Sequence, residues 1–474
     1  MKHHLPSTGG RQEAFPGETD LLLAAAALLA ASIHTFGVVE APTAPQTSLV
    51  VSAPGARQPP EGLNHHPSPT TVSSAVRLAA QSGPDALLTE LGRFDPAQLR
   101  AVAADAQVQA TVFDAPPTAP RVQKWWAELS HAAQTRLEDD APAIVGNLEG
   151  VPYGVRDRAN RAYLTQALRE NERSAVASSR TLAMLEQVRY ALRRAPGTPM
   201  KQLLTLDPRG SGRAAIAIGN MATASDVTVM VPGMFFTVTG QMQDWTNTAE
   251  NVYAEQASLA PQATDESTGI AVLAWMGYRT PDLSNVLSLQ LAKVGAQRFE
   301  RVVAGLDTMR AASEPRVNVV AHSYGSTTAL IALSSGRIHV QSLTLYGSPG
   351  SSVASASQLG VTSGQVFVGD AHWDPIAGTG YFGVDPGSHG FGAHLLDLVG
   401  GASTAFDGDV FRSPFGHNEY LKPGTASLHD VALIAIGRSD LVARSGDPNA
   451  PANPADPHSP QFLLVRPQDL LVRD

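Results

Sequence analysis

The sequence predicts an α/β protein, with a mainly parallel sheet covered by helices on both faces and an all-helical region before it. Two observations support this. Between Leu203 and Arg438, short runs rich in Val and Ile alternate with helical patterns, which is typical of a parallel sheet. Between Thr71 and Ala195, apolar residues recur at helical spacing throughout. We therefore expect helices first and the sheet second.

The composition excludes several classes of function. The chain has 474 residues, a net charge of −9 and only five lysines, so no basic patch for nucleic acid is expected. It has no cysteine, which excludes a thiol nucleophile, a thiolate metal site and a disulfide framework. The pairs His3-His4 and His65-His66 have no carboxylates at ligand spacing. We therefore expect neither a metal nor another cofactor.

Changes in composition divide the chain into four parts. Residues 1–70 contain nine prolines and predict a flexible arm and linker. Residues 71–200 predict a helical region that packs on the body of the protein, and residues 201–440 predict the α/β domain. Residues 441–474 are rich in proline and asparagine and predict a mostly disordered tail.

An apolar segment at residues 21–39 has two interpretations. Its length fits the core of an export signal, but acidic residues stand before it where positive charge is expected. We favour a helical arm docked on the body, and with it a cytoplasmic location over an exported or envelope-anchored one. Association with a membrane stays open.

The helical region contains residues that are typical of helix N-termini. Asp95-Pro96 predicts an N-cap followed by proline at the first helical position, and Ser130 predicts a second cap. The long segment Gly154–Leu192 is highly charged. Its arginines at 156, 158 and 161 suit either an anion site or a solvated helix face, and we favour the solvated face.

The strands of the α/β domain are expected where Val and Ile gather between glycines and prolines. They are Ala214–Ile218, Val227–Val231, Ala271–Met276, Val317–Ala321, Val340–Tyr346 and Gln365–Gly369, with a terminal helix at Thr425–Ile436. Ligands of such sheets bind at the carboxyl ends of the strands. Ser323, Gly233–Phe236 and Asp370–Asp374 all fall there.

The stretch Val317–Ser326 predicts the catalytic centre. A Val-rich strand leads into His322, Ser323, Tyr324 and a glycine, and a helical pattern follows. Strand, tight turn and helix in this order form a nucleophile elbow, which lifts the serine hydroxyl clear of the sheet. The bare pentapeptide also occurs by chance, but its flanks favour a catalytic serine.

The residues two positions from the serine must be small for the turn to form. Gly325 meets this requirement, and Ala321 stands where glycine is usual, which sterics allow.

A serine nucleophile needs a histidine base, and the base needs a carboxylate to fix its tautomer. Asp370 and Asp374 compete for the carboxylate; we favour Asp374, because it lies deeper in the loop and a proline follows it. For the base we favour His417, in the loop directly before the terminal helix. The competing histidines are His372, His389, His394 and His429.

The negative charge of the tetrahedral intermediate needs two N–H donors. The first is expected from Tyr324, directly after the nucleophile, and the second from Met234, in the loop after the second predicted strand. Gly233 allows the backbone to approach a substrate closely. Phe235 and Phe236 suit either an apolar acyl pocket or the core.

Several spaced motifs resemble one protein family. They are Leu148–Arg161, Leu206–Arg213, Val231-Pro-Gly233, His322–Ser326, Gly347-Ser-Pro-Gly350 and Gly416-His417. The chain is similar over Trp125–Arg438 to a bacterial α/β-hydrolase family, common in actinobacteria and first catalogued as a domain of unknown function. The resemblance implies a serine hydrolase fold with Ser323, Asp374 and His417 at the triad positions. It implies no particular substrate.

The leading hypothesis is a metal-independent serine esterase that acts on a small or lipid-like ester, or on an amide, through an acyl-enzyme. One alternative is a degenerate hydrolase body that only binds a partner; another is an acyltransferase on the same triad. The Gly-rich segment 375–410 suits a lid or simple packing.

Overall fold

The computed structural model describes residues 69–173, 178–263, 269–402 and 410–445, and all of them belong to one compact unit. The predicted arm at 1–68, its apolar segment at 21–39 and the tail from 446 lie outside the described residues. Within the described ranges, no helix is both long and apolar enough to cross a membrane. The division at residue 200 stays a prediction.

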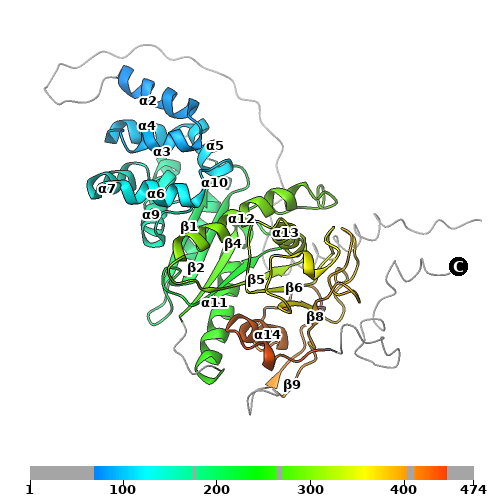
Figure 1. Ribbon diagram of the computed structural model, residues 1–474. Coiled ribbons are helices and arrows are strands. Elements are labelled where there is room, and N and C mark those ends of the chain that lie inside the picture. Colours follow the sequence, from blue (N-terminus) through cyan, green and yellow to red (C-terminus); the bar gives the residue numbers. More distant parts are fainter. Residues whose placement is uncertain (1–68, 174–177, 264–268, 403–409, 446–474) are drawn as a thin grey trace, which may run out of the picture. The chain divides into compact units, whose positions relative to one another are not determined.

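The described part of the chain begins with helices, as the sequence predicts (Figure 1). The Asp95 side chain caps its helix by accepting the N–H groups of Ala97 and Gln98, and the Ser130 hydroxyl accepts that of Ala133. A buried apolar cluster that includes Leu99 joins these helices. The helices are α2 (Pro69–Gln81), α3 (Pro84–Leu91), α4 (Pro96–Ala104), α5 (Ala106–Asp114), α6 (Ala119–Glu128), α7 (His131–Asp140), α8 (Pro142–Val145), α9 (Tyr153–Arg173) and α10 (Ser179–Ala191).

A sheet of eight strands follows, in the order β1-β2-β4-β3-β5-β6-β7-β8. Strand β2 is antiparallel to both of its neighbours, β1 and β4, and every other pair of neighbouring strands is parallel. The sheet is therefore mainly parallel, as predicted. The first strand, β1, was not predicted, because the expected sheet began at Ala214. The strands are β1 (Lys201–Asp207), β2 (Arg213–Gly219), β3 (Asp226–Val231), β4 (Ile270–Met276), β5 (Arg316–His322), β6 (Ser342–Tyr346), β7 (Val366–Gly369) and β8 (His394–Leu395).

Helices cover both faces of the sheet. Helices α12 (Gln290–Arg310) and α13 (Tyr324–Leu333) lie on one side, and α11 (Val238–Ala263) and α14 (Ala426–Ala435) lie on the other (Figure 1). Strand β5 is central: Ala321 pairs with Val231 of β3 on one side and with Leu345 of β6 on the other. A strand with two parallel neighbours and two covered faces is rigid, so β5 holds the segment after it in a fixed place. A short hairpin, β9 (Gly401–Ala402) with β10 (Val410–Phe411), lies apart from this sheet.

Side chains of the helical region cover the free edge of β1. Asp157 accepts the backbone N–H of Leu203 at 2.7 Å, while Arg161 donates to the carbonyl of Lys201 at 2.6 Å. Arg156 is 2% exposed and donates to the carbonyl of Leu204 at 2.6 Å. The favoured solvated face is therefore wrong for Arg156, which is buried. It holds for Arg158, which is exposed and pairs with Glu138. Asp157 and Arg161 pair with each other on the helix and, like Arg156, supply hydrogen bonds that an edge strand otherwise leaves open.

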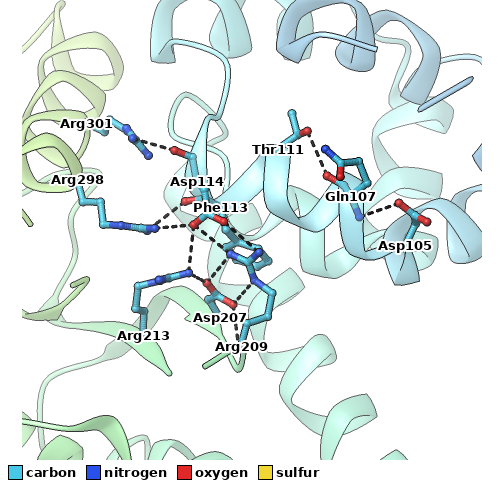
Figure 2. A network of polar contacts seen from close by, with 10 residues as sticks. All are labelled: Asp105, Gln107, Thr111, Phe113, Asp114, Asp207, Arg209, Arg213, Arg298 and Arg301. Carbon is cyan, nitrogen blue, oxygen red and sulfur yellow. Dashed lines mark hydrogen bonds and ion pairs between the residues drawn. The ribbon is translucent and has the colours of Figure 1, made fainter. Parts of the chain in front are cut away.

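A cluster of arginines and aspartates joins the helical region to the α/β part (Figure 2). We call it the Asp114 cluster. Its members are Asp114 at the end of α5, Asp207 at the end of β1, Arg209 in the turn that follows, Arg213 at the start of β2, and Arg298 and Arg301 on α12.

Asp114 is the centre of this cluster. Its carboxylate accepts from Arg298 at 2.6 Å and from Arg209 at 3.2 Å, and its carbonyl accepts from Arg301 at 3.1 Å. Four arginines face two aspartates, so positive charge is in excess. Burial, followed by the charge of Arg213, lowers the pKa of Arg298 to about 10.

We expect Asp114→Asn to lower the free energy of unfolding by about 1–3 kcal/mol, between the values for surface and buried ion pairs. The loss arises because the arginines of α12 and of the β1–β2 turn then repel one another with Asp207 alone left in the cluster to compensate their charge. Urea denaturation measures it, and the loss should shrink at high salt, which screens that repulsion.

Asp440→Asn is the matched control, since Asp440 pairs with Arg438 on the surface. We expect it to change stability by less than about 0.5 kcal/mol. Equal effects of the two substitutions, or a loss at Asp114 that salt leaves unchanged, would contradict this role for the cluster.

Candidate active site

Ser323 lies in the sharp turn between β5 and α13. Its backbone has φ 56° and ψ −132°, in a region that residues with side chains rarely occupy. The turn is held at its start by a hydrogen bond of 2.9 Å from the N–H of Ser323 to the carbonyl of Tyr346. Strained backbone of this kind persists only where the surrounding structure imposes it. Here the rigid central strand and the helix after it impose it.

Two glycines allow this turn to pack against the loop after β3. A Cβ on Gly325 would lie 2.5 Å from the carbonyl oxygen of Pro232, and a Cβ on Gly233 would lie 2.6 Å from the Cβ of Ser323. Neither distance is tolerable, so α13 and the β3 loop approach closely because both residues lack a side chain. Ala321 is fully buried, and its single methyl group is accommodated.

Asp374 and His417 meet beside this turn. Asp374 follows β7, and His417 lies in the loop before α14. The Nδ1 atom of His417 lies 2.8 Å and 2.9 Å from the two carboxylate oxygens of Asp374. Gly347, at φ 55°, faces both: a Cβ there would lie 2.6 Å from Asp374 Oδ2 and 2.9 Å from His417 Nδ1. The pair therefore has no room for a side chain at residue 347.

Asp374 is a buried carboxylate with a full set of donors. Besides His417, it accepts the N–H of Ile376 at 2.9 Å and the hydroxyl of Tyr420 at 2.5 Å. Burial alone would raise its pKa, but His417 and these hydrogen bonds outweigh burial and lower the pKa to about 2. Asp374 is therefore ionised at every pH at which an enzyme is ordinarily assayed.

The competing residues lie elsewhere. His429 is on α14, as predicted, and its Nδ1 lies 3.1 Å from the carboxylate of Glu255. His394 is on β8, and the side chains of His372 and His389 are exposed. Asp370 directly follows β7, and no hydrogen bond between it and His417 is found. The structure thus brings Asp374 and His417 together, and neither Asp370 nor any of the four competing histidines takes the place of either.

The second ring nitrogen of His417 is free to act on a neighbour. Nε2 is buried and has no hydrogen-bond partner among the described residues. The ring lies beside the Ser323 turn, because its centroid is 4.4 Å from that of His322, the residue before the serine. A neutral imidazole whose Nδ1–H is bound to a carboxylate presents Nε2 as an acceptor. This is the state that a general base requires.

His322 makes a contact that was not predicted. Its Nε2 lies 2.6 Å from the backbone carbonyl of His417, so Nε2 carries the proton and donates it. Burial, followed by the neighbouring His417 ring, lowers the pKa of His322 to about 3. His322 is therefore neutral and serves as a fixed donor between the two loops.

The predicted oxyanion donors come from the loop after β3 and from the start of α13. Met234 follows β3, and Tyr324 is the first residue of α13. Within the described ranges, neither backbone N–H donates to a protein acceptor. At Tyr324, the N-terminus of a helix also favours negative charge. Both groups are thus available to a bound oxygen.

The candidate pocket residues differ from each other. Phe235 is half-buried at φ 64°, and its N–H donates to the carbonyl of Pro281 at 2.9 Å. Phe236 is also half-buried, and its ring packs against Trp245 at 5.1 Å in the core. Phe236 therefore serves the core, while Phe235 stays the better candidate for a substrate contact.

The segment 375–410 packs on the body where it is described. Phe391 and Leu396 are buried, and the Phe382 ring lies 5.5 Å from that of Tyr324. Residues 403–409 lie outside the described ranges. Over the described part of the chain, no group of three or more acidic or histidine side chains is placed to hold a metal ion.

Three residues that touch the Asp374–His417 pair were missed as candidates: His322, Gly347 and Tyr420. His322 and Gly347 belong to short motifs already quoted for the family resemblance. Gly347 opens Gly347-Ser-Pro-Gly350, and Tyr420 comes three residues after His417. A glycine at the end of a strand was the one local signal available, since the other two contacts depend on how distant loops pack.

Comparison with known proteins identifies the family. A family model described as alpha/beta hydrolase matches residues 207–384. An uncharacterized protein of Mycobacterium bovis is 33% identical, and the match covers 43% of this chain and 79% of that protein. The chain therefore belongs to the alpha/beta hydrolase family, as its motifs indicated.

A longer relative matches more of the chain. An uncharacterized protein of Mycobacterium tuberculosis is 31% identical, and the match covers 69% of this chain. This chain spans about 57% of that relative's length. A solved arylesterase structure aligns at 9% identity over 59% of this chain and 97% of its own, with a TM-score of 0.32. A similarity that weak says nothing about substrate.

Proposed function

We propose that the protein hydrolyses a carboxylic ester through an acyl-enzyme formed on Ser323. In this proposal His417 is the general base and Asp374 fixes the orientation of His417. Tyr324 and Met234 supply the oxyanion donors. The substrate class is a small or lipid-like ester.

The observation that carries the proposal is the arrangement around His417. Nδ1 is bound to an ionised carboxylate, and Nε2 is buried, unpartnered among the described residues and beside the Ser323 turn. A buried nitrogen without a partner is costly in a folded protein. The cost is understandable if Nε2 receives a proton during a reaction.

The reaction follows from these positions. His417 Nε2 takes the proton of the Ser323 hydroxyl as Oγ attacks the carbonyl carbon of the ester. The negative charge that forms on the carbonyl oxygen is stabilised by the N–H groups of Met234 and Tyr324. His417 then gives its proton to the leaving alcohol, and the acyl group remains on Ser323. Water, activated by the same histidine, releases the acid.

Nitrophenyl esters with acyl groups from acetyl to palmitoyl test the proposal. We expect turnover by the purified protein, with an initial burst of nitrophenol where release of the acyl group is slow. The acyl length with the highest kcat/KM then defines the depth of the pocket. Addition of an acceptor alcohol separates hydrolysis from acyl transfer, because a transferase forms a new ester in proportion to the acceptor. Absence of turnover at every acyl length would contradict the proposal.

A further inference from the structure

Tyr420 makes a contact that the proposed reaction does not require. Its hydroxyl donates to Asp374 Oδ2 at 2.5 Å and accepts the N–H of Ala371 at 2.8 Å. The side chain is 2% exposed, and the residue follows His417 by three positions. One short loop thus carries the histidine and also a group that binds the histidine's carboxylate.

The hydroxyl of Tyr420 stays protonated. Burial, followed by the negative charge of Asp374, raises its pKa well above the ordinary value. A phenol that keeps its proton donates to a carboxylate at every accessible pH. The interaction is therefore a permanent charge-assisted hydrogen bond, which is among the stronger kinds in proteins.

The ring of Tyr420 is itself held rigidly. It stacks on the ring of Tyr346, with centroids 4.8 Å apart and planes inclined by 15°. Tyr346 is anchored in turn, because its hydroxyl donates to the carbonyl of Ser427 on α14 at 2.7 Å. The Tyr420 hydroxyl is therefore fixed relative to β6 and α14.

The two oxygens of Asp374 have different partners. Oδ1 accepts the N–H groups of Ile376 and Ala377 at 2.9 Å and 3.3 Å, and Oδ2 accepts the hydroxyl of Tyr420. His417 Nδ1 faces both oxygens at nearly equal distances. Without the phenol, His417 is the one donor to Oδ2 that remains among the described residues, so the hydrogen bonds that oppose rotation of the carboxylate lie mostly at Oδ1.

We propose that Tyr420 is a positioning residue, which fixes the Asp374 carboxylate toward His417 and reduces the basicity of the Asp374–His417 pair. This inference rests on the proposed function of that pair. A hydrogen bond to a charged group typically contributes enough for a tenfold to hundredfold effect on a rate that depends on it.

Kinetics of Tyr420→Phe test the inference. We expect kcat to fall by about tenfold to a hundredfold with little change in KM, since the phenol does not touch the substrate. We also expect the acid limb of the kcat/KM profile to move to higher pH. A carboxylate that loses a donor is more basic, so the pair binds its proton more tightly.

Tyr346→Phe is the matched control. It removes a hydroxyl from the same buried stack, but that hydroxyl binds α14 and not Asp374. Loss of stability should be similar in the two variants, while the pH profile should shift much less in Tyr346→Phe, because the Tyr420 hydroxyl still donates to Asp374 there. A Tyr420→Phe profile that superimposes on that of the parent, or the same shift in both variants, would overturn the inference.

A second measurement separates this inference from the proposed function. The titration of the His417 ring is followed by nuclear magnetic resonance, with the signal assigned by its loss in His417→Gln. A higher midpoint in Tyr420→Phe supports the positioning role even if the protein hydrolyses none of the esters. Equal midpoints overturn that role even if the protein proves to be an esterase.

Discussion

Replacement of Ser323 by alanine lowers ester turnover by about 10⁴–10⁶-fold, because the substitution removes the attacking oxygen and leaves the rest of the site in place. Substrate binding changes little, so KM should stay close to that of the parent. Alanine and serine both carry a Cβ, so the substitution leaves the strain at φ 56° as it is. Initial rates and thermal unfolding of the same preparation measure the two effects separately.

Ser334→Ala is the control for Ser323. Ser334 is exposed at the other end of α13, and its hydroxyl binds the carbonyl of Ile331. This variant should retain the turnover of the parent. Substantial turnover by a folded Ser323→Ala protein would show that another residue, or bound water, is the nucleophile.

Replacement of Asp374 by asparagine lowers kcat by about 10⁴-fold. The amide has one oxygen in place of two, and His417 Nδ1 lies beside both positions, so an NH₂ group in either position can impose the wrong tautomer on His417. At the Oδ1 position the NH₂ group also opposes the N–H groups of Ile376 and Ala377, and at the Oδ2 position it cannot accept the hydroxyl hydrogen of Tyr420. Steady-state kinetics with the nitrophenyl ester of highest kcat/KM measure the loss of kcat.

The loss of turnover in Asp374→Asn should not depend on pH across an ordinary assay range. The folded pKa of Asp374 is about 2, below the ordinary value, so the parent carries the carboxylate throughout an ordinary assay range. The deficit of Asp374→Asn should therefore persist at every pH tested. Asp370→Asn serves as the control and should retain turnover within a few fold. Equal losses in both variants would contradict the assignment of Asp374.

Much of the sheet could be predicted because its strands are buried on both faces. Short Val-rich runs such as Val227–Val231 and Val317–Ala321 are typical of strands that are covered in this way. Strand β1 was missed because its sequence, Lys-Gln-Leu-Leu-Thr-Leu-Asp, has few β-branched residues. Side chains such as Asp157 and Arg161 complete its hydrogen bonds from about 40–46 positions away. No local pattern records such an arrangement.

The candidate site followed from local signals and from chain order. The strand–turn–helix pattern marks Ser323, a loop after a strand marks Asp374, and a loop before the last helix marks His417. The contacts of His322 and Tyr420 connect residues 95 and 46 positions apart. They depend on how these loops pack, and a single sequence carries no trace of that packing.

Labelling with a fluorophosphonate tests the central claim most directly. The reagent reacts with a serine that a neighbouring base has activated, whatever the natural substrate is. The account predicts one adduct on the peptide that contains Ser323, and its absence from Ser323→Ala and from His417→Gln. A folded protein that remains unlabelled, or a label on another peptide, would contradict it.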